Sequence, residues 1–204
     1  MIYFDKDLNA YCDLNVLKEE DVVYSCDNEI WNKYLSGEYI WEDNELVPNP
    51  DYAQETAKKY ATELENTLYK LKAQKAYGGI LINDLLIFET NQTSITNTVA
   101  SIALMQDTDT TNWKYYNLDN VPTFVPTTKA QLVYIAQFAR KMIDDSFVVE
   151  GKYNNIVVNA TVKQLNSEKF RNKLLADAKA EFDEVNNKLN ITFGVNEQIT
   201  GIEE

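Results

Sequence analysis

The sequence predicts an α+β protein, and three observations lead to this fold class. Residues 52–77 carry small and apolar side chains at alternating spacings of four and three, the pattern of an amphipathic helix. Residues 80–88 and 113–126 each hold two short apolar or aromatic runs around a polar turn, which is typical of a β-hairpin. A helical pattern follows each hairpin. The chain from residue 52 onward is therefore predicted as helix, hairpin, helix, hairpin, helix, with a helical arm at the C-terminal end.

Residues 1–50 are predicted to form a small β-rich module. Two short aromatic-bearing strands, "MIYF" and "AYCD", flank the polar turn "DKDLN". A strand at Val22–Ser25 and a short helix from about Asp27 to Leu35 follow, and a second hairpin turns at Asp43-Asn44. The predicted organisation is therefore a module at 1–50, a long helix with an α+β domain at 51–150, and a C-terminal helix and tail at 151–204.

The long helix carries the stripe of a helix-pairing seam. Its small and apolar residues recur at the a and d positions of a heptad, and a helix of this length spans about 39 Å, more than the module at 1–50 can cover. The stripe packs on later helices of this chain, on a copy of the chain or on a partner. Its residues are Ala57, Ala61, Leu64, Leu68 and Leu71.

The hairpin at residues 80–88 is apolar on both of its predicted faces. Asn83-Asp84 supplies the turn, since these residue types tolerate positive φ, and the strands on either side contain no polar residue. Both faces are expected to be covered, one by the helices and the other by more protein.

The remaining elements are read from their apolar faces and turns. A helix near Ser94–Met105, with Thr93 or Ser94 as N-cap, is expected to bury Ile95, Val99, Ile102 and Ala103. The hairpin around Trp113 leads to a helix that starts near Thr127, and a final helix runs from about Ser167 to Lys188. The tail after it is either a strand or a docking extension. The buried stripe of the helix after Thr127 comprises Leu132, Ile135, Ala136, Ala139, Met142 and Ile143.

Charge and composition exclude several classes of partner. The 19 Lys and Arg residues against 32 Asp and Glu give a net charge of −13, which repels nucleic-acid phosphates and anionic membranes. We expect no nucleic-acid or membrane partner, and the start of the chain lacks the pattern of a secretory signal, so synthesis in the cytoplasm is expected. Cys12 and Cys26 are expected to be free thiols, the alternative being a bridge that closes an N-terminal loop.

No catalytic, metal or cofactor site is expected from the residues. The chain contains no histidine, which excludes His-ligated zinc and the Ser-His-Asp triad. The best calcium pattern, Asp107, Asp109 and Asn112, lacks the glycine and glutamate that such a loop needs at its sixth and twelfth positions. Acidic pairs such as Asp144-Asp145 are expected by chance among 32 acids. Function is therefore expected to come from binding surfaces.

Two parts of the sequence resemble bacteriophage tail proteins. The order of elements in residues 69–147, from Gly78-Gly79 through "ILINDLLIF" to "NWKYYNLDNVPTFVP", resembles a domain of unknown function found in phage tail and tail-fibre assembly proteins. The N-terminal module, with Tyr3-Phe4, Asn9-Ala10-Tyr11, Trp31, Gly37 and "ELVPNPDY", resembles the start of tail-fibre assembly proteins. Members of that family bind trimeric tail fibres, help them fold and in some cases remain on the particle.

The resemblance implies a non-enzymatic phage tail protein, either a fibre assembly factor or a retained virion component. The expected partner is another tail protein, a trimeric tail fibre above all, and self-association through the helical seam stays open. The alternative is a hydrolase that acts on host surface glycan, which would need two carboxyl groups about 5–10 Å apart in a concave site. The residues expected to contact a partner are Ile80, Ile82, Leu86, Phe88, Trp113, Tyr116, Leu64, Leu68 and Leu71.

Overall fold

The computed structural model of the chain describes residues 1–16 and 18–192, and it confirms the α+β class. The chain forms two compact units, residues 1–60 and 61–204, and each is described separately. This division replaces the three expected segments. The C-terminal helix packs within the second unit and is not a separate arm.

The first unit contains a three-stranded antiparallel sheet in the order β2-β1-β3. Strand β1 (Ile2–Phe4) pairs with β2 (Ala10–Tyr11), as the hairpin pattern predicted, and also with β3 (Tyr24–Cys26), a pairing that the sequence did not predict. Two short 3₁₀ helices, Leu14–Val16 and Glu19–Asp21, lie between β2 and β3.

A short helix and a hairpin complete the first unit. The side chain of Asp27 caps α1 (Asn28–Leu35) by accepting from the backbone N–H of Ile30. Strands β4 (Tyr39–Glu42) and β5 (Glu45–Pro48) form the predicted hairpin, and both of its turn residues have positive φ. A small core joins these pieces. It consists of buried Phe4, Cys26 and Leu46 surrounded by aromatic rings that include Trp31 and Trp41.

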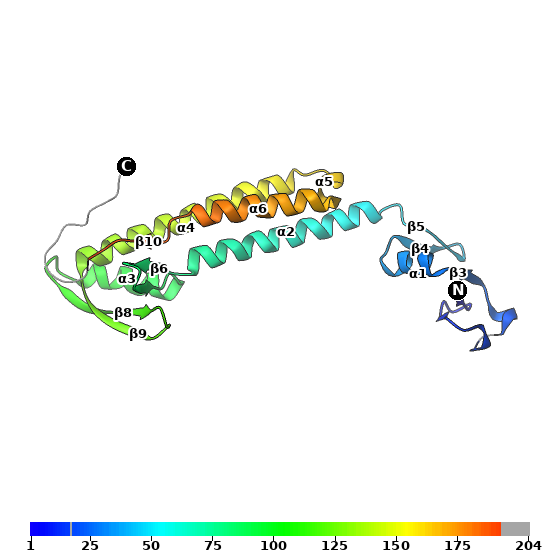
Figure 1. The fold of residues 1–204 in the computed structure, drawn as a ribbon, viewed down its shortest axis with the longest axis horizontal. Coiled ribbons are helices and arrows are strands. Elements are labelled where there is room, and N and C mark those ends of the chain that lie inside the picture. Colours follow the sequence, from blue (N-terminus) through cyan, green and yellow to red (C-terminus); the bar gives the residue numbers. More distant parts are fainter. Residues whose placement is uncertain (17, 193–204) are drawn as a thin grey trace. The chain divides into compact units, whose positions relative to one another are not determined.

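Three long helices lie side by side in the second unit (Figure 1). The predicted helix α2 (Tyr52–Tyr77) enters this unit at Ala61, and α4 (Lys129–Val158) and α6 (Glu168–Glu184) pack together, joined by the short α5 (Val162–Asn166). Helix α4 is longer than the sequence pattern indicated. A capping box between Thr128 and Gln131 begins it. The fully or nearly fully buried side chains of α2, α4 and α6 include Leu64, Leu68, Ala76, Ile135, Ala139, Met142, Val157, Ala178 and Phe182.

The predicted seam on α2 is confirmed for Leu64 and Leu68 and is wrong further along. Leu71 is only half-buried, and the buried positions after Leu68 are Lys72 and Ala76. The buried row therefore advances by four residues at each step, and such rows are inclined to the helix axis. A heptad stripe would require the neighbouring helix to supercoil along α2.

The second unit also contains a five-stranded sheet in the order β10-β6-β7-β8-β9. The predicted hairpins are β6 (Ile80–Ile82) with β7 (Leu86–Phe88), and β8 (Thr110–Asn117) with β9 (Pro122–Thr128). Strand β10 (Lys188–Leu189) adds in parallel to β6.

Asparagine and glutamine side chains hold the segment after β10 in place. Ile191 donates its backbone N–H to Asn83, whose side-chain amide donates back to the Ile191 carbonyl, and Gln131 donates to the carbonyl of Thr192. The expected strand or docking extension after Thr192 lies outside the described residues.

Gly79 makes the close approach between α2 and the hairpin possible. Its φ is +95°, and a Cβ at this position would lie 2.7 Å from Cγ2 of Ile87 and 3.1 Å from the carbonyl oxygen of Phe88. Its backbone N–H donates to Oγ1 of buried Thr90. The Gly78-Gly79 pair therefore ends α2 and lets the chain turn directly into the sheet.

Two prolines face outward on the β9 edge of the sheet. Pro126 is the register partner of Asn112 and Pro122 the partner of Tyr116. Since proline has no N–H, these are the non-hydrogen-bonded pairs of the ladder, and the proline nitrogens point away from β8.

Helix α3 (Gln92–Leu104) differs from its prediction at the N-cap and in the face that it buries. Asn91 is the cap and accepts from the backbone N–H of Ser94. The buried position of α3 is Thr98, whereas Val99 and Ala103, which were expected to be buried, are exposed, and Ile95 and Ile102 are partly exposed. The fully buried position is thus small and polar, and the apolar face is left partly at the surface.

Candidate partner-binding surfaces

Five of the residues expected to contact a partner are core residues in this structure. The sheet and helices of the second unit enclose their side chains, so the expectation of partner contact is corrected for them. The five are Leu64, Leu68, Ile80, Ile82 and Phe88, each no more than 3% exposed. Long apolar runs in a sequence do not distinguish a surface from a core, because both place the same residue types together.

The other four expected residues lie at least partly at the surface. Leu71, Leu86, Trp113 and Tyr116 are half-buried. The hairpin at 80–88 has one buried face, with Ile80, Ile82 and Phe88, and one partly exposed face, with Leu81 and Ile87. The chain itself thus buries the first face, and coverage of the second face by more protein stays a prediction.

An apolar groove runs between α3 and α4. Its volume is about 460 Å³, and Gln137 and Arg140 are its polar lining residues. Val99 contributes a side chain that is 57% exposed. The remaining lining is aliphatic and consists of Ile95, Ile102, Val133, Ala136 and Ile143. Exposed apolar surface of this kind is typical of protein interfaces.

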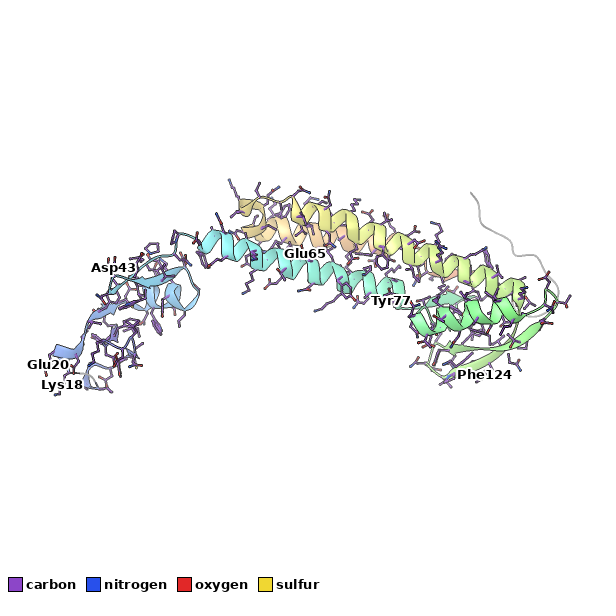
Figure 2. All side chains as sticks on the ribbon, turned by 180° about the vertical axis from the view of Figure 1, so that it is seen from behind. Lys18, Glu20, Asp43, Glu65, Tyr77 and Phe124 are labelled. Atoms are coloured by element: carbon purple, nitrogen blue, oxygen red, sulfur yellow. The ribbon has the colours of Figure 1, made fainter. Side chains whose placement is uncertain are left out.

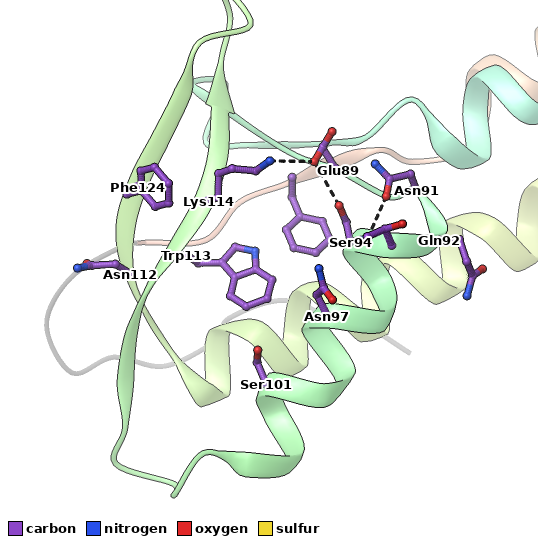
Figure 3. A pocket seen from close by; sticks show the side chains of 12 residues that line it. Glu89, Asn91, Gln92, Ser94, Asn97, Ser101, Asn112, Trp113, Lys114 and Phe124 are labelled. Atoms are coloured by element: carbon purple, nitrogen blue, oxygen red, sulfur yellow. Dashed lines mark hydrogen bonds and ion pairs between the residues drawn. The ribbon is translucent and has the colours of Figure 1, made fainter.

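A second groove of about 710 Å³ separates β8 from α3 (Figure 3). Trp113 points from β8 into it, toward Asn97 and Ser101 on α3. Phe88 forms part of the lining, and so does Phe124 on β9 (labelled in Figure 2), which is 65% exposed. The lining thus combines aromatic rings with amide and hydroxyl groups.

One ion pair lies at the upper end of this groove. The ammonium of Lys114 is 3.8 Å from Glu89 and donates to the hydroxyl of Tyr116 at 2.8 Å, while Ser94 donates to Glu89 at 3.2 Å. The hydrogen bond to Tyr116 and the nearby Glu89 carboxylate raise the pKa of Lys114. The pair leaves the groove with little net charge near neutral pH.

Sequence reasoning placed Trp113 and Tyr116 near a binding surface but missed the opposite wall of this groove. Asn97 and Ser101 were assigned no role, and Asn91 was not recognised as the cap of α3. A signal was present in the amide side chains at 91, 92 and 97, which suit a polar groove wall. The groove itself could be identified only from the position of β8 opposite α3.

Carboxylates are scattered among the surface pockets of the described residues. Each of the two grooves and two smaller hollows, one near Lys129 and one near Lys188, has at most one carboxylate in its described lining. In the calcium-like loop, Asp107 pairs with Lys129 at 2.9 Å, and Asp109 accepts from the backbone of Gln106 at 2.7 Å. Within residues 1–16 and 18–192, no three acidic or thiol side chains come together as metal ligands.

The fold and its surfaces define a two-unit α+β protein with two open grooves, one apolar and one lined by aromatic and amide groups. Comparison of the chain with protein-family models, with curated proteins and with solved structures finds no match. Among the described helices, none is both long and apolar enough to cross a membrane.

Proposed function

We propose that this chain is a bacteriophage tail protein that acts by stoichiometric binding to another tail component, as an assembly factor of the tail fibre or as a retained part of the virion. The resemblance of residues 1–50 and 69–147 to tail-fibre assembly proteins names the partner class. The binding mode rests on the surface of the second unit.

The groove between α3 and α4 is the observation that carries the proposal. Val99 is exposed and its neighbours Ile95 and Ile102 are half-buried, so aliphatic surface of α3 is left open to water. Leaving aliphatic side chains in water forgoes about 25 cal/mol per Å² of burial. A partner that covers the groove recovers this free energy, which is the usual origin of affinity at an interface core.

The charge of the chain limits which partner surfaces it can bind. The net charge of −13 disfavours an acidic partner. The partner surface is therefore neutral or basic, with an apolar centre.

Co-expression with a tail fibre tests the proposal. The wild-type chain should raise the yield of soluble fibre trimer, because it shields apolar fibre surface until assembly is complete. Val99→Asp places a charge in the apolar groove and should remove most of this effect. Val158→Asp is the matched control, because Val158 is 72% exposed on the last turn of α4, outside the groove.

Two further results decide between the roles and the alternative function. A retained component should persist as a 23.5 kDa band in density-purified particles, whereas an assembly factor should be lost. The hydrolase alternative predicts that the purified chain degrades host surface glycan and loses that activity on one Asp or Glu substitution. That result would replace the binding proposal.

A further inference from the structure

We infer that the inner edge of β8 binds an extended segment of the partner protein as an added β-strand. The inference rests on the proposed binding function and assigns it a second contact site with its own chemistry, main-chain hydrogen bonding. The apolar groove between α3 and α4 is a separate surface, so the two contacts can be tested independently.

The first observation is that β7 covers only one end of β8. Strand β7 pairs with β8 at Tyr116 and Asn117, while β8 continues to Thr110. Beyond Phe88 the chain leaves the sheet and enters α3 through Asn91. On this side, the described residues provide no pairing strand along 110–114.

The second observation is the direction of the main-chain groups on that edge. Asn112 lies opposite Pro126, which cannot donate a hydrogen bond, so the N–H and C=O of Asn112 point away from β9. Asn117 donates its N–H to Val121 across the β8–β9 turn, which gives the same alternation. The main-chain groups of Lys114, two residues from Asn112, therefore also face the groove, and among the described residues no partner strand or turn satisfies them.

The third observation is that the groove has room at this edge. Both Asn112 and Lys114 line the 710 Å³ groove, and α3 forms its other wall (Figure 3). An added strand would continue the line of β7 past Phe88. Five residues of strand span about 17 Å, enough to reach from Lys114 to Thr110.

Side chains on the two faces of the edge indicate what the added strand carries. Trp113 lies on one face of β8, where an apolar guest side chain would contact its ring. Exposed Phe124 and the Lys114–Glu89 pair lie on the other face, which suits a second uncharged residue. The guest is thus a neutral extended segment, and flanking lysines suit the −13 charge of the chain.

Direct binding of a synthetic strand tests this inference. The probe is an acetylated and amidated octapeptide, one Lys at each end and alternating Val and Thr between them, and its binding to the full chain is measured by isothermal titration calorimetry. Successive N–H groups of an extended strand point to opposite edges. One analogue therefore carries N-methyl groups on the odd-numbered residues and the other on the even-numbered residues, so that each analogue blocks one edge. Methylation of the edge that faces β8 should weaken binding by about tenfold or more, and methylation of the other edge should change it little.

Variants at position 112 separate main-chain from side-chain recognition. Asn112→Pro removes the N–H that faces the groove without removing a bond to β9, and it should weaken peptide binding by about fivefold to tenfold. Asn112→Thr keeps the N–H and removes the amide side chain, and it should bind like the wild type. Circular dichroism of both variants verifies the fold.

The inference is overturned by any of three outcomes. They are no binding of the unmethylated peptide, equal binding of both methylated analogues, and equal loss in Asn112→Pro and Asn112→Thr. Fibre co-expression keeps this result distinct from the proposed function. If the peptide fails to bind the wild-type chain but both the wild type and Asn112→Pro raise the yield of fibre trimer, the protein acts through another surface. Only the strand addition is then wrong.

Discussion

Lys72 is a charged residue in the helical core of the second unit, at 5% exposure. Its ammonium lies 3.1 Å from Glu150 on α4, and the rings of Tyr69 and Phe147 are within 4.3 Å and 4.2 Å of it. A lone ammonium at this position would be costly, since burial removes its hydration. The carboxylate and the two ring faces compensate for that loss.

Removing one partner of this pair should destabilise the fold more than removing both. Glu150→Leu leaves the ammonium of Lys72 without a carboxylate and should lower the free energy of unfolding by about 3 kcal/mol. The double variant with Lys72→Met should recover part of this loss, because both charges are then absent. Urea unfolding of the four proteins in the cycle measures the coupling. Strictly additive losses would show that solvent screens the pair.

Tyr115 links the sheet to alkaline stability. Burial raises its pKa to about 12, while the hydrogen bond with Thr127 at 3.0 Å lowers it slightly. The folded state therefore disfavours the phenolate, and the stabilisation by Tyr115 is complete below the ordinary pKa of 10.0 and is lost as pH rises toward 12.

Tyr115→Phe should therefore be less stable than the wild type at neutral pH, by about 1 kcal/mol for one buried hydrogen bond. Between pH 10 and 12 this difference should shrink and then reverse, because Phe has no group to ionise. Denaturant midpoints at pH 7, 10 and 11 measure it. A difference that stays constant with pH would mean that Tyr115 ionises as readily in the folded chain as in the unfolded chain.

At the scale of elements, the inclined row on α2 decides which leucines stabilise the bundle. Leu68 is fully buried, so Leu68→Ala should cost about 2–5 kcal/mol. Leu71→Ala makes the same chemical change at a half-buried position one turn further on, and it should cost clearly less. Thermal melts monitored by circular dichroism compare the two. Equal shifts would favour the heptad seam over the inclined row.

Elements of the fold were predictable where local chemistry specifies them. Asn83-Asp84 and Asp43-Asn44 both adopt the positive φ that their residue types indicated, and α2 has its predicted bounds. Faces were less predictable, because burial depends on the neighbour that each element meets. Nothing local to residues 92–104 shows that Thr98 faces the core and Val99 the surface.

The candidate binding surface was likewise only partly predictable from the sequence. Trp113 and Tyr116 could be assigned to a binding surface as aromatic residues of a hairpin, but five aliphatic or aromatic candidates proved to be core. The open stretch of β8 could not be predicted, since it depends on where β7 stops pairing. That point is set by the turn into α3 and not by any residue of β8.

At the scale of the whole molecule, the chain has two cores that should unfold separately. Phe4 is central to the aromatic cluster of residues 1–60, and Leu68 to the bundle of residues 61–204. Trp31 and Trp41 report on the first unit, and Trp113 reports on the second. A protein with two cooperative units does not follow a two-state transition.

Phe4→Ala should shift the unfolding seen by Trp31 and Trp41 and leave the signal of Trp113 unchanged. Leu68→Ala should have the reverse effect. Fluorescence melts of the full chain in a Trp113→Phe background, and in a Trp31→Phe, Trp41→Phe background, separate the two signals. A single transition that both variants move equally would show one cooperative unit.

The outward prolines of β9 determine how many strands the sheet can accept. A sheet edge with free N–H groups can recruit copy after copy and grow into aggregates. Pro122 and Pro126 remove two of the donors that β9 would direct outward and leave Phe124 between them, so growth of the sheet beyond β9 is disfavoured. Each molecule is then monovalent for strand addition at this end of the sheet, and samples at high concentration should stay free of edge-to-edge polymers.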